Sequence, residues 1–241
     1  MENYPKPVSI KCTQKILEQM ENSICKILEK EGEFKIGIFC KLKYKNNIFP
    51  VLITSYQIIN ERLKEGINNI EIIENNGLQL IEFGKRKYLN KEYDLSIIEI
   101  KDNKNNKINY LEVDESINEY DSEIYYNNES IYILHYNNNL NDILVSYGII
   151  NNMNKDQLIF SCNIHSNYNC LPIFNLSNNK IIGLYNNKSN YYNRGIFLKF
   201  IINEFFNVHK SKKKNNEINL IVEVKKIKLV EKFIFWIIII T

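Results

Sequence analysis

The 241-residue sequence contains no alanine, and it has only eight glycines, four prolines and one tryptophan. Alanine is the strongest helix former, so its absence removes the residue that most favours long helices. The apolar residues that are present include 42 isoleucines, 16 tyrosines and 12 phenylalanines, which favour strands. With 44% hydrophobic and 24% charged residues, the chain can bury a core of useful size. The composition therefore favours a globular, β-rich fold.

An excess of charge of either sign is also missing. The 31 basic and 28 acidic residues are mixed along most of the chain and give a net charge of +3. This balance indicates neither a nucleic-acid partner nor an acidic substrate. The one concentrated basic run comprises Lys210, Lys212, Lys213 and Lys214, and it is typical of a solvated linker rather than of a phosphate-binding or lipid-binding site.

Paired cysteines, metal-ligand spacings and long apolar runs are absent as well. The five cysteines form no CxxC pair, and the three histidines are scattered, so we expect no metal and no cofactor. The first residues, MENYPKPVSIKC, lack the apolar stretch of a secretory signal, which predicts reduced thiols in an intracellular, cytoplasmic protein. The apolar run Phe233–Ile240 is too short for a membrane helix, which needs about 20 residues, so we expect no transmembrane span.

Hydrophobic periodicity predicts one helix at each end of a series of strands. Thr13 can cap a helix that carries Ile16 and Met20 on one face and ends near residue 22, and a hairpin over residues 23–44 follows. Asn, Asp, Lys, Ser and Gly, which are common in turns, separate the later apolar segments. We expect strands at 49–55, 69–74, 78–85, 95–100, 130–136, 144–150, 158–162, 171–176, 180–186 and 195–200. Apolar residues at 198, 201, 202, 205 and 206 predict a closing helix. The series predicts an all-β barrel or sandwich.

Four segments carry a resemblance to a known family by their order and spacing. They read KIGIFCKL (35–42), VLITSYQII (51–59), YDLSIIEI (93–100) and NYNCLPIFNLSNNKIIGLY (167–185). Together they resemble the trypsin-like serine peptidases of the chymotrypsin fold, over about residues 23–206. The resemblance implies an all-β protein of two antiparallel β-barrels, with a short N-terminal helix and a C-terminal helix.

The resemblance also implies a division of the chain into four parts. Residues 1–22 would form an N-terminal helical segment, residues 23–115 the first barrel, and residues 116–210 the second barrel with its closing helix. The polar stretch 111–130 would link the barrels, and residues 211–241 would form a basic linker and an apolar tail.

Family roles carry over to five positions, and two of the three triad positions have changed. The general-base histidine falls on Gln57, the orienting aspartate on Asp94 and the nucleophilic serine on Asn169. The glycine that supplies an oxyanion-hole amide falls on Asn167, and the glycine after the nucleophile on Cys170. The resemblance therefore implies a triad reduced to its aspartate.

The changed positions lack the chemistry that hydrolysis requires. A nucleophile must be a hydroxyl or thiol that a nearby base can deprotonate, and the amide at position 169 is neither. The base must accept a proton near neutral pH and return it to the leaving group, and glutamine does not titrate in that range. Loss of one triad member already costs several orders of magnitude in rate. Peptidase activity is therefore expected to be absent.

Other interpretations of these residues stay open at this point. Cys170 and His165 could form a Cys–His pair in a rearranged loop. The alternative is that Cys170 is an inert thiol and His165 an ordinary surface residue. His135 is expected to be an ordinary strand residue. Asp94 either accepts a hydrogen bond from the Gln57 amide or caps the turn before strand 95–100.

The favoured function is therefore a pseudo-protease that binds an extended peptide or acts as a regulatory module. Exposed strand edges can pair with such a peptide. Tyr191, Tyr192 and Arg194 lie where the family builds its substrate pocket, and they could line a peptide groove. The alternatives are a divergent hydrolase that uses Cys170 as its nucleophile and a decaying copy of the family.

Overall fold

The computed structural model describes ten segments of the chain: residues 4–22, 24–28, 34–74, 77–101, 108–119, 122–137, 142–154, 156–164, 169–186 and 193–208. The predicted basic linker and apolar tail, residues 211–241, lie outside them.

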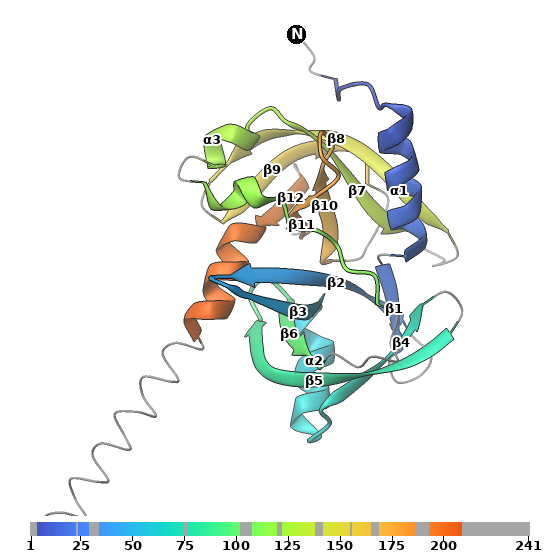
Figure 1. Ribbon diagram of the computed structural model, residues 1–241, viewed down its shortest axis with the longest axis vertical. Helices are drawn as coiled ribbons and strands as arrows, with labels where there is room; N and C mark the ends of the chain where they lie inside the picture. Colours follow the sequence, from blue (N-terminus) through green and yellow to red (C-terminus); the bar gives the residue numbers. More distant parts are fainter. Residues whose placement is uncertain are drawn as a thin grey trace, which may run out of the picture.

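Twelve strands form two closed antiparallel barrels that lie one above the other (Figure 1). The first barrel has the order β1-β2-β3-β6-β5-β4 and the second the order β10-β11-β12-β9-β8-β7. The first comprises β1 (Ile24–Leu28), β2 (Phe34–Tyr44), β3 (Asn47–Thr54), β4 (Asn69–Glu74), β5 (Gly77–Asn90) and β6 (Leu95–Ile100). The second comprises β7 (Ser130–Tyr136), β8 (Ile143–Met153), β9 (Gln157–Cys162), β10 (Leu171–Asn175), β11 (Ile181–Tyr185) and β12 (Asn193–Phe197). The predicted all-β class with two antiparallel barrels is confirmed, whereas the division of the chain into four parts stays a prediction.

Strand β2 buries both of its faces over residues 36–40, which explains why this part of its sequence is continuously apolar. Successive side chains of a strand point to opposite faces. Phe39 packs with Leu52 and Ile98 inside the first barrel. Ile38 and its even-numbered neighbours belong instead to the large apolar cluster shared with the second barrel. The two barrels are therefore held together by a continuous apolar layer.

The helices lie at the margins of the barrels. They are α1 (Ile10–Asn22), α2 (Tyr56–Lys64), the short 3-10 helix η2 (Glu115–Asn118), α3 (Ser122–Tyr126) and a closing helix over residues 198–208. The N-terminal helix ends at Asn22, as its periodicity predicts, and the closing helix is also confirmed. The prediction of a strand through residue 200 is wrong, because β12 ends at Phe197 and the helix begins at the next residue.

Two further differences concern short elements that periodicity did not reveal. The apolar run 49–55 continues into α2, whose Ile58 and Ile59 are buried against the first barrel while its other face is solvent-exposed. The segment predicted as a plain linker, 111–130, contains η2 and α3. Asp114 begins this local structure, because its carboxylate accepts the Ser116 N–H at 3.2 Å and its main-chain N–H donates to the Ile181 carbonyl at 3.0 Å.

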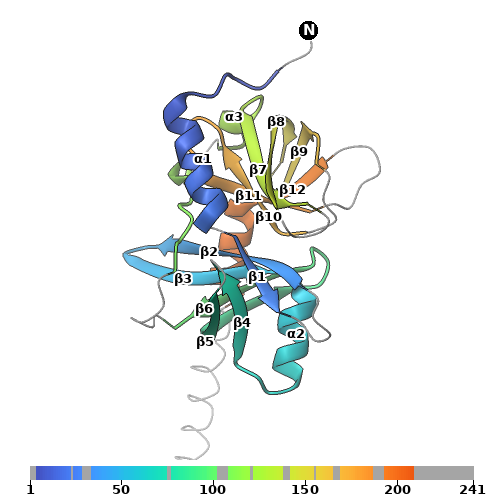
Figure 2. The same cartoon turned by 90° about the vertical axis from the view of Figure 1, so that its right-hand side faces the viewer.

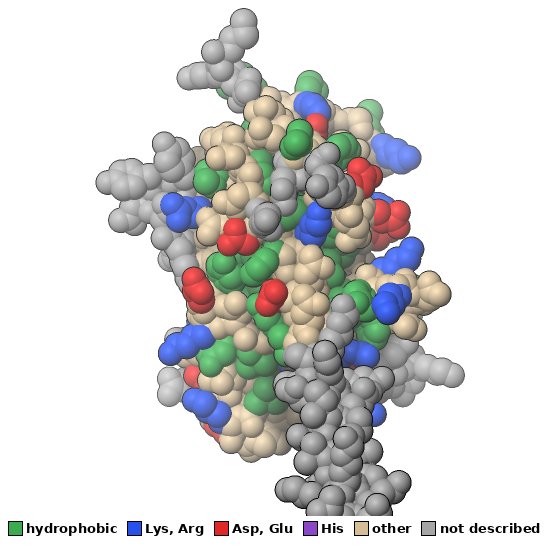
Figure 3. Space-filling model, turned by 90° about the vertical axis from the view of Figure 1, so that its left-hand side faces the viewer, with side chains coloured by type: hydrophobic (Ala, Val, Ile, Leu, Met, Phe, Trp, Pro, Cys, Tyr) green, Lys and Arg blue, Asp and Glu red, His purple; other side chains and the backbone are tan. Residues whose placement is uncertain are grey.

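One face of the molecule carries side chains of both charges. In the view of Figure 3, basic and acidic side chains are interspersed over the face rather than gathered into a patch of one sign. Among the described residues, no helix is both long and apolar enough to cross a membrane.

Helix α1 precedes a strand of the first barrel but packs on the second, through a buried polar network. The Gln19 amide donates to the Asn179 carbonyl at 2.8 Å, and the Tyr132 hydroxyl donates to Gln19 Oε1. The Asn179 amide in turn donates to the Tyr132 oxygen at 3.2 Å. These hydrogen bonds fix α1 to β7 and to the residues before β11.

We expect Tyr132→Phe to lower the free energy of unfolding by roughly 1–3 kcal/mol, because it removes the hydroxyl that donates to the buried Gln19 Oε1 and accepts from the Asn179 amide. Tyr147→Phe is the matched control, since Tyr147 lies beside Tyr132 with ring centroids 6.5 Å apart but is 37% exposed. Urea unfolding followed by circular dichroism measures both variants. Equal losses in the two variants would contradict a stabilising role of the network.

Candidate functional site

The predicted triad aspartate lies at the end of a tight turn. Residues 91–94 connect β5 to β6, with the Asp94 N–H donating to the Lys91 carbonyl at 3.3 Å and the Tyr93 N–H donating to Asn90 Oδ1 at 2.9 Å. Asp94 adopts a left-handed backbone conformation with φ of 47°. Aspartate tolerates this conformation better than most residues that carry a Cβ. The turn places the half-buried Asp94 side chain at the junction of the two barrels.

The Asp94 carboxylate accepts hydrogen bonds from both sides of that junction. Oδ1 accepts the main-chain N–H of Tyr56, at the start of α2, at 3.1 Å. Oδ2 accepts the Asn169 amide, just before β10 in the second barrel, at 3.4 Å. The structure therefore brings Asp94 and Asn169 together across the two barrels, although they are 75 residues apart in the sequence.

Gln57 lies beside this junction, but its side chain is not part of it. It is exposed in the first turn of α2 and donates from Nε2 to Glu61 Oε1 at 3.1 Å, one turn further along. Of the two alternatives for Asp94, the hydrogen bond from the Gln57 amide is therefore wrong. The physical reason is that α2 begins at Tyr56, so a main-chain N–H at the helix start meets the carboxylate instead.

Cys170 also contacts Asp94, through the main chain. Its Sγ is buried and donates to the Asp94 carbonyl oxygen at 3.3 Å. Burial, and to a lesser degree the nearby Asp94 charge, raise the pKa of the Cys170 thiol well above its usual value. Cys170 itself has φ of 63°, the left-handed conformation that favours the glycine expected at this position.

Two residues that the sequence analysis did not single out complete the junction. The Tyr93 hydroxyl donates to Asp156 Oδ2 at 3.0 Å, and burial together with that carboxylate raises the pKa of Tyr93 to about 12. Asn186 donates from Nδ2 to the Tyr93 carbonyl at 3.1 Å, while its buried Oδ1 has no partner among the described residues. Tyr93 was visible only as the neighbour of Asp94, and Asn186 only as the end of a predicted strand.

The other predicted site residues divide into described and undescribed ones. Asn167, His165, Tyr191 and Tyr192 lie outside the described segments. Arg194 is exposed on β12, opposite Ile159 of β9. In the parts of the chain that the structure describes, no three His, Cys, Asp or Glu side chains are grouped as metal ligands.

His135 is a buried residue of β7, as expected. Its Nε2 lies 2.9 Å from Ser146 Oγ, and that hydroxyl donates to the Asn163 carbonyl at 2.7 Å. Because the hydroxyl proton is directed at the carbonyl, His135 Nε2 donates to Ser146. The pair therefore holds β8 and the segment after β9 in place.

Among the described residues, the Asp94 carboxylate accepts hydrogen bonds from the Tyr56 main-chain N–H and the Asn169 side-chain amide. Asp94 can accept protons in hydrogen bonds, but neither Asn169 nor Gln57 can give up or take a proton near neutral pH. The arrangement supports hydrogen bonding across the barrels and contains no proton relay from Asp94 to a nucleophile at position 169.

Neither protein-family models nor curated proteins match the sequence. Solved structures do match the fold. An inactive form of Rv3671c from M. tuberculosis H37Rv aligns with a TM-score of 0.55 and 10% identity, over 87% of this chain and 98% of that chain. Deg5 aligns with a TM-score of 0.55 and 14% identity, over 80% and 91%. A human pathogenic astrovirus serine protease aligns with a TM-score of 0.49 and 11% identity, over 82% and 95%.

These identities are low, so the likeness concerns the fold and not the activity. Rv3671c and Deg5 are trypsin-like serine proteases, and each matches most of its length to this chain. The two six-stranded barrels agree with that architecture. The chain therefore has the trypsin-like serine protease fold.

Proposed function

We propose that the chain is a catalytically inactive homologue of the trypsin-like serine proteases, which acts as a peptide-binding or regulatory module. The observation that carries the proposal is the hydrogen bond from the Asn169 amide to Asp94 Oδ2. An amide occupies the place where the resemblance expects the attacking hydroxyl, and it uses the retained carboxylate as a structural acceptor.

The proposal follows from what each group can do chemically. Hydrolysis of a peptide bond needs a nucleophile, a base that returns its proton to the leaving amine, and a group that orients the base. Asp94 is the type of residue that orients the base, but the Gln57 side chain donates to Glu61 and is not a base that Asp94 could orient. Binding places no such demand, because an extended peptide needs only an open strand edge and side-chain contacts.

The exposed Arg194 on β12 supports a binding role of the junction face. With Tyr191 and Tyr192, which precede it in the sequence, it would supply a guanidinium and two aromatic rings to a peptide. Such residues are common where proteins bind peptides, because they combine large contact area with hydrogen-bond donors.

The first prediction concerns activity. The full chain should release no fluorophore above the buffer rate from a fluorogenic peptide library, and a fluorophosphonate probe should not label it. Asn169→Ala should leave both results unchanged, because no nucleophile is lost. Turnover that disappears in Asn169→Ala or in Gln57→Ala would show that these positions take part in chemistry and would end the proposal.

The alternative is a divergent hydrolase that uses Cys170, and the geometry disfavours it. The Cys170 thiol is buried and donates to a main-chain carbonyl, and its raised pKa keeps it protonated at neutral pH. A nucleophilic cysteine is instead exposed and has a lowered pKa.

The second prediction therefore concerns thiol reactivity. Native protein treated with a low dose of iodoacetamide at pH 8 should leave Cys170 unmodified, along with Cys40, whose pKa burial raises to about 12. Both should react fully after unfolding in guanidinium chloride, with peptide mapping by mass spectrometry as the readout. Selective native labelling of Cys170, with loss of a hydrolytic activity in Cys170→Ala, would support the alternative.

The third prediction gives Asp94 a stabilising role. Asp94→Asn keeps the shape of the side chain and a residue type tolerant of the left-handed backbone, but it removes one acceptor of the two N–H donors at 3.1 and 3.4 Å. We expect the free energy of unfolding to fall by roughly 1–3 kcal/mol. Asp142→Asn, on the exposed β7–β8 connection, is the control and should change it by less than about 0.5 kcal/mol. An unchanged Asp94→Asn midpoint in urea would contradict this role.

A decaying copy of the family remains a third interpretation, and solubility separates it from a selected module. Poor solubility of the full chain that is rescued by removing residues 233–241 would favour decay.

A further inference from the structure

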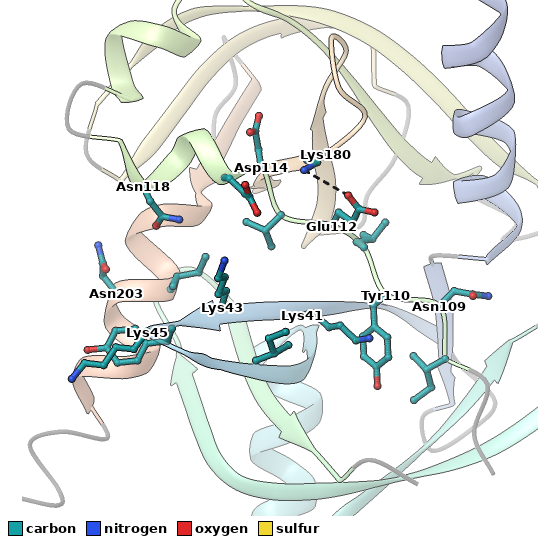
Figure 4. Close-up of a pocket in the computed structure, with 17 residues that line it drawn as sticks. Lys41, Lys43, Lys45, Asn109, Tyr110, Glu112, Asp114, Asn118, Lys180 and Asn203 are labelled. Carbon is teal, nitrogen blue, oxygen red and sulfur yellow. Dashed lines mark ion pairs between the residues drawn. The ribbon is translucent and has the colours of Figure 1, made fainter. Parts of the chain in front are cut away.

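A groove with a volume of about 910 Å³ lies on a part of the molecule that the proposed function does not use (Figure 4). Its walls are the β2–β3 hairpin, the inter-barrel segment 108–118 and the closing helix 198–208. No residue of the Asp94 junction lines it. In Figure 2 the inter-barrel segment and α2 lie on opposite sides of the molecule, so the groove and the junction face away from each other.

Three lysines follow the hairpin rim of the groove. Lys41, Lys43 and Lys45 alternate with less exposed residues, and all three are exposed. Lys41 lies over the Tyr110 ring at 4.6 Å and Lys45 over the Tyr44 ring at 6.0 Å. In the described part of the chain, none of the three ammonium groups forms an ion pair with a carboxylate. This row is referred to below as the basic rim.

The acidic side chains on the opposite wall are largely occupied. Glu112 forms an ion pair with Lys180 at 3.7 Å (Figure 4). Asp114 is 2% exposed, and its Oδ2 accepts the amides of Asn175 and Asn178 at 3.2 and 2.9 Å. Glu115 is the remaining acidic residue of the lining. The lining carries four lysines against three acidic residues, and the three lysines of the basic rim form no ion pair among the described residues.

The basic rim also carries an open strand edge. The Phe39 carbonyl accepts the Leu111 N–H at 2.7 Å, so odd-numbered residues of β2 direct their main-chain groups away from β3. The inter-barrel segment then leaves β2, because Val113 bridges to Ile181 of β11. Strand β1 pairs with β2 only as far as Ile38. Among the described residues, nothing covers the main-chain N–H and carbonyl of Lys43 on this edge.

Apolar side chains line both sides of the groove. Ile48 of β3 is 62% exposed and lies opposite Lys43, on the same face of the hairpin. Val113 of the inter-barrel segment and Ile202 of the closing helix line the groove from the other side. Tyr44 stacks on Phe206 with ring centroids 4.2 Å apart, which fixes the hairpin against the closing helix. The groove is therefore preformed, with apolar surface between the basic rim and the opposite wall.

We propose that this groove binds an extended acidic segment of a partner protein, in which carboxylates alternate with apolar residues. The segment adds to the open edge at Lys43 as a short strand. Side chains opposite one another on paired strands share a face, so alternate carboxylates of the segment lie on the face that carries Lys41, Lys43 and Ile48. The residues between them point to the other face, where Tyr44 packs on the closing helix. The inference goes beyond the proposed function and holds whether or not the Asp94 junction has activity.

The test uses fluorescein-labelled Glu-Ile-Glu-Val-Glu-Ile, with Lys-Ile-Lys-Val-Lys-Ile as the charge-reversed probe, and fluorescence anisotropy with the full chain. We expect the acidic peptide to bind at least tenfold more tightly than the basic one, and its affinity to fall with added salt. The triple variant Lys41→Glu, Lys43→Glu, Lys45→Glu should lose at least tenfold in affinity. The control Lys11→Glu, Lys64→Glu, Lys85→Glu makes the same change of net charge at exposed lysines elsewhere and should bind normally.

Location is checked by carbodiimide cross-linking of the peptide carboxylates to lysines, mapped by mass spectrometry, with Lys41, Lys43 or Lys45 expected. Equal loss in the two triple variants would overturn the proposal, as would cross-links confined to other lysines.

A dimer in sedimentation that the rim variant dissociates would assign the groove to a second copy and also overturn it. Binding that appears only in a variant ending at Val208 would assign the groove to the chain's own C-terminal segment. Asp94→Asn should leave peptide affinity unchanged, which separates this test from that of the proposed function.

Discussion

The turn at Tyr93 and Asp94 is the contact on which the relation of the two barrels depends. Asp94 accepts N–H groups from α2 and from Asn169, and Tyr93 reaches Asp156 with its hydroxyl and Asn186 with its carbonyl. A short turn that is fixed by its own hydrogen bonds can hold both side chains at once, since little conformational freedom remains to be lost. In this protein the residue that the resemblance assigns to orienting a base instead connects the two halves of the molecule.

The apolar layer and the polar junction have complementary effects. Residues such as Ile38 of β2 belong to the large apolar cluster that both barrels share, and its burial supplies a non-directional driving force for their association. Hydrogen bonds at Asp94 add direction, because they require defined distances and angles. The trypsin-like fold can thus be kept without a nucleophile, since neither the apolar layer nor this junction requires one.

The sequence predicted the strands better than the short helix α2 that directly follows one of them. Alternating isoleucines separated by asparagine-rich turns placed the strands at 69–74, 95–100 and 130–136 with the bounds that the structure has. Helix α2 was not predicted, because its nine residues directly continue an apolar strand and carry only two buried isoleucines. Without that helix, the sequence left open a hydrogen bond from Gln57 to Asp94. Because α2 begins at Tyr56, the Gln57 side chain lies on the helix surface and donates to Glu61 instead.

By itself the sequence determined the β-rich class, the order of the strands along the chain and the amide side chains at positions 57 and 169, because these follow from residue type and local periodicity. Only the tertiary structure decided which amide meets Asp94, that the Cys170 thiol is buried against its carbonyl, and that the lysines of β2 border a groove. Each of these depends on contacts between segments far apart in the chain, and local periodicity carries no information about such contacts.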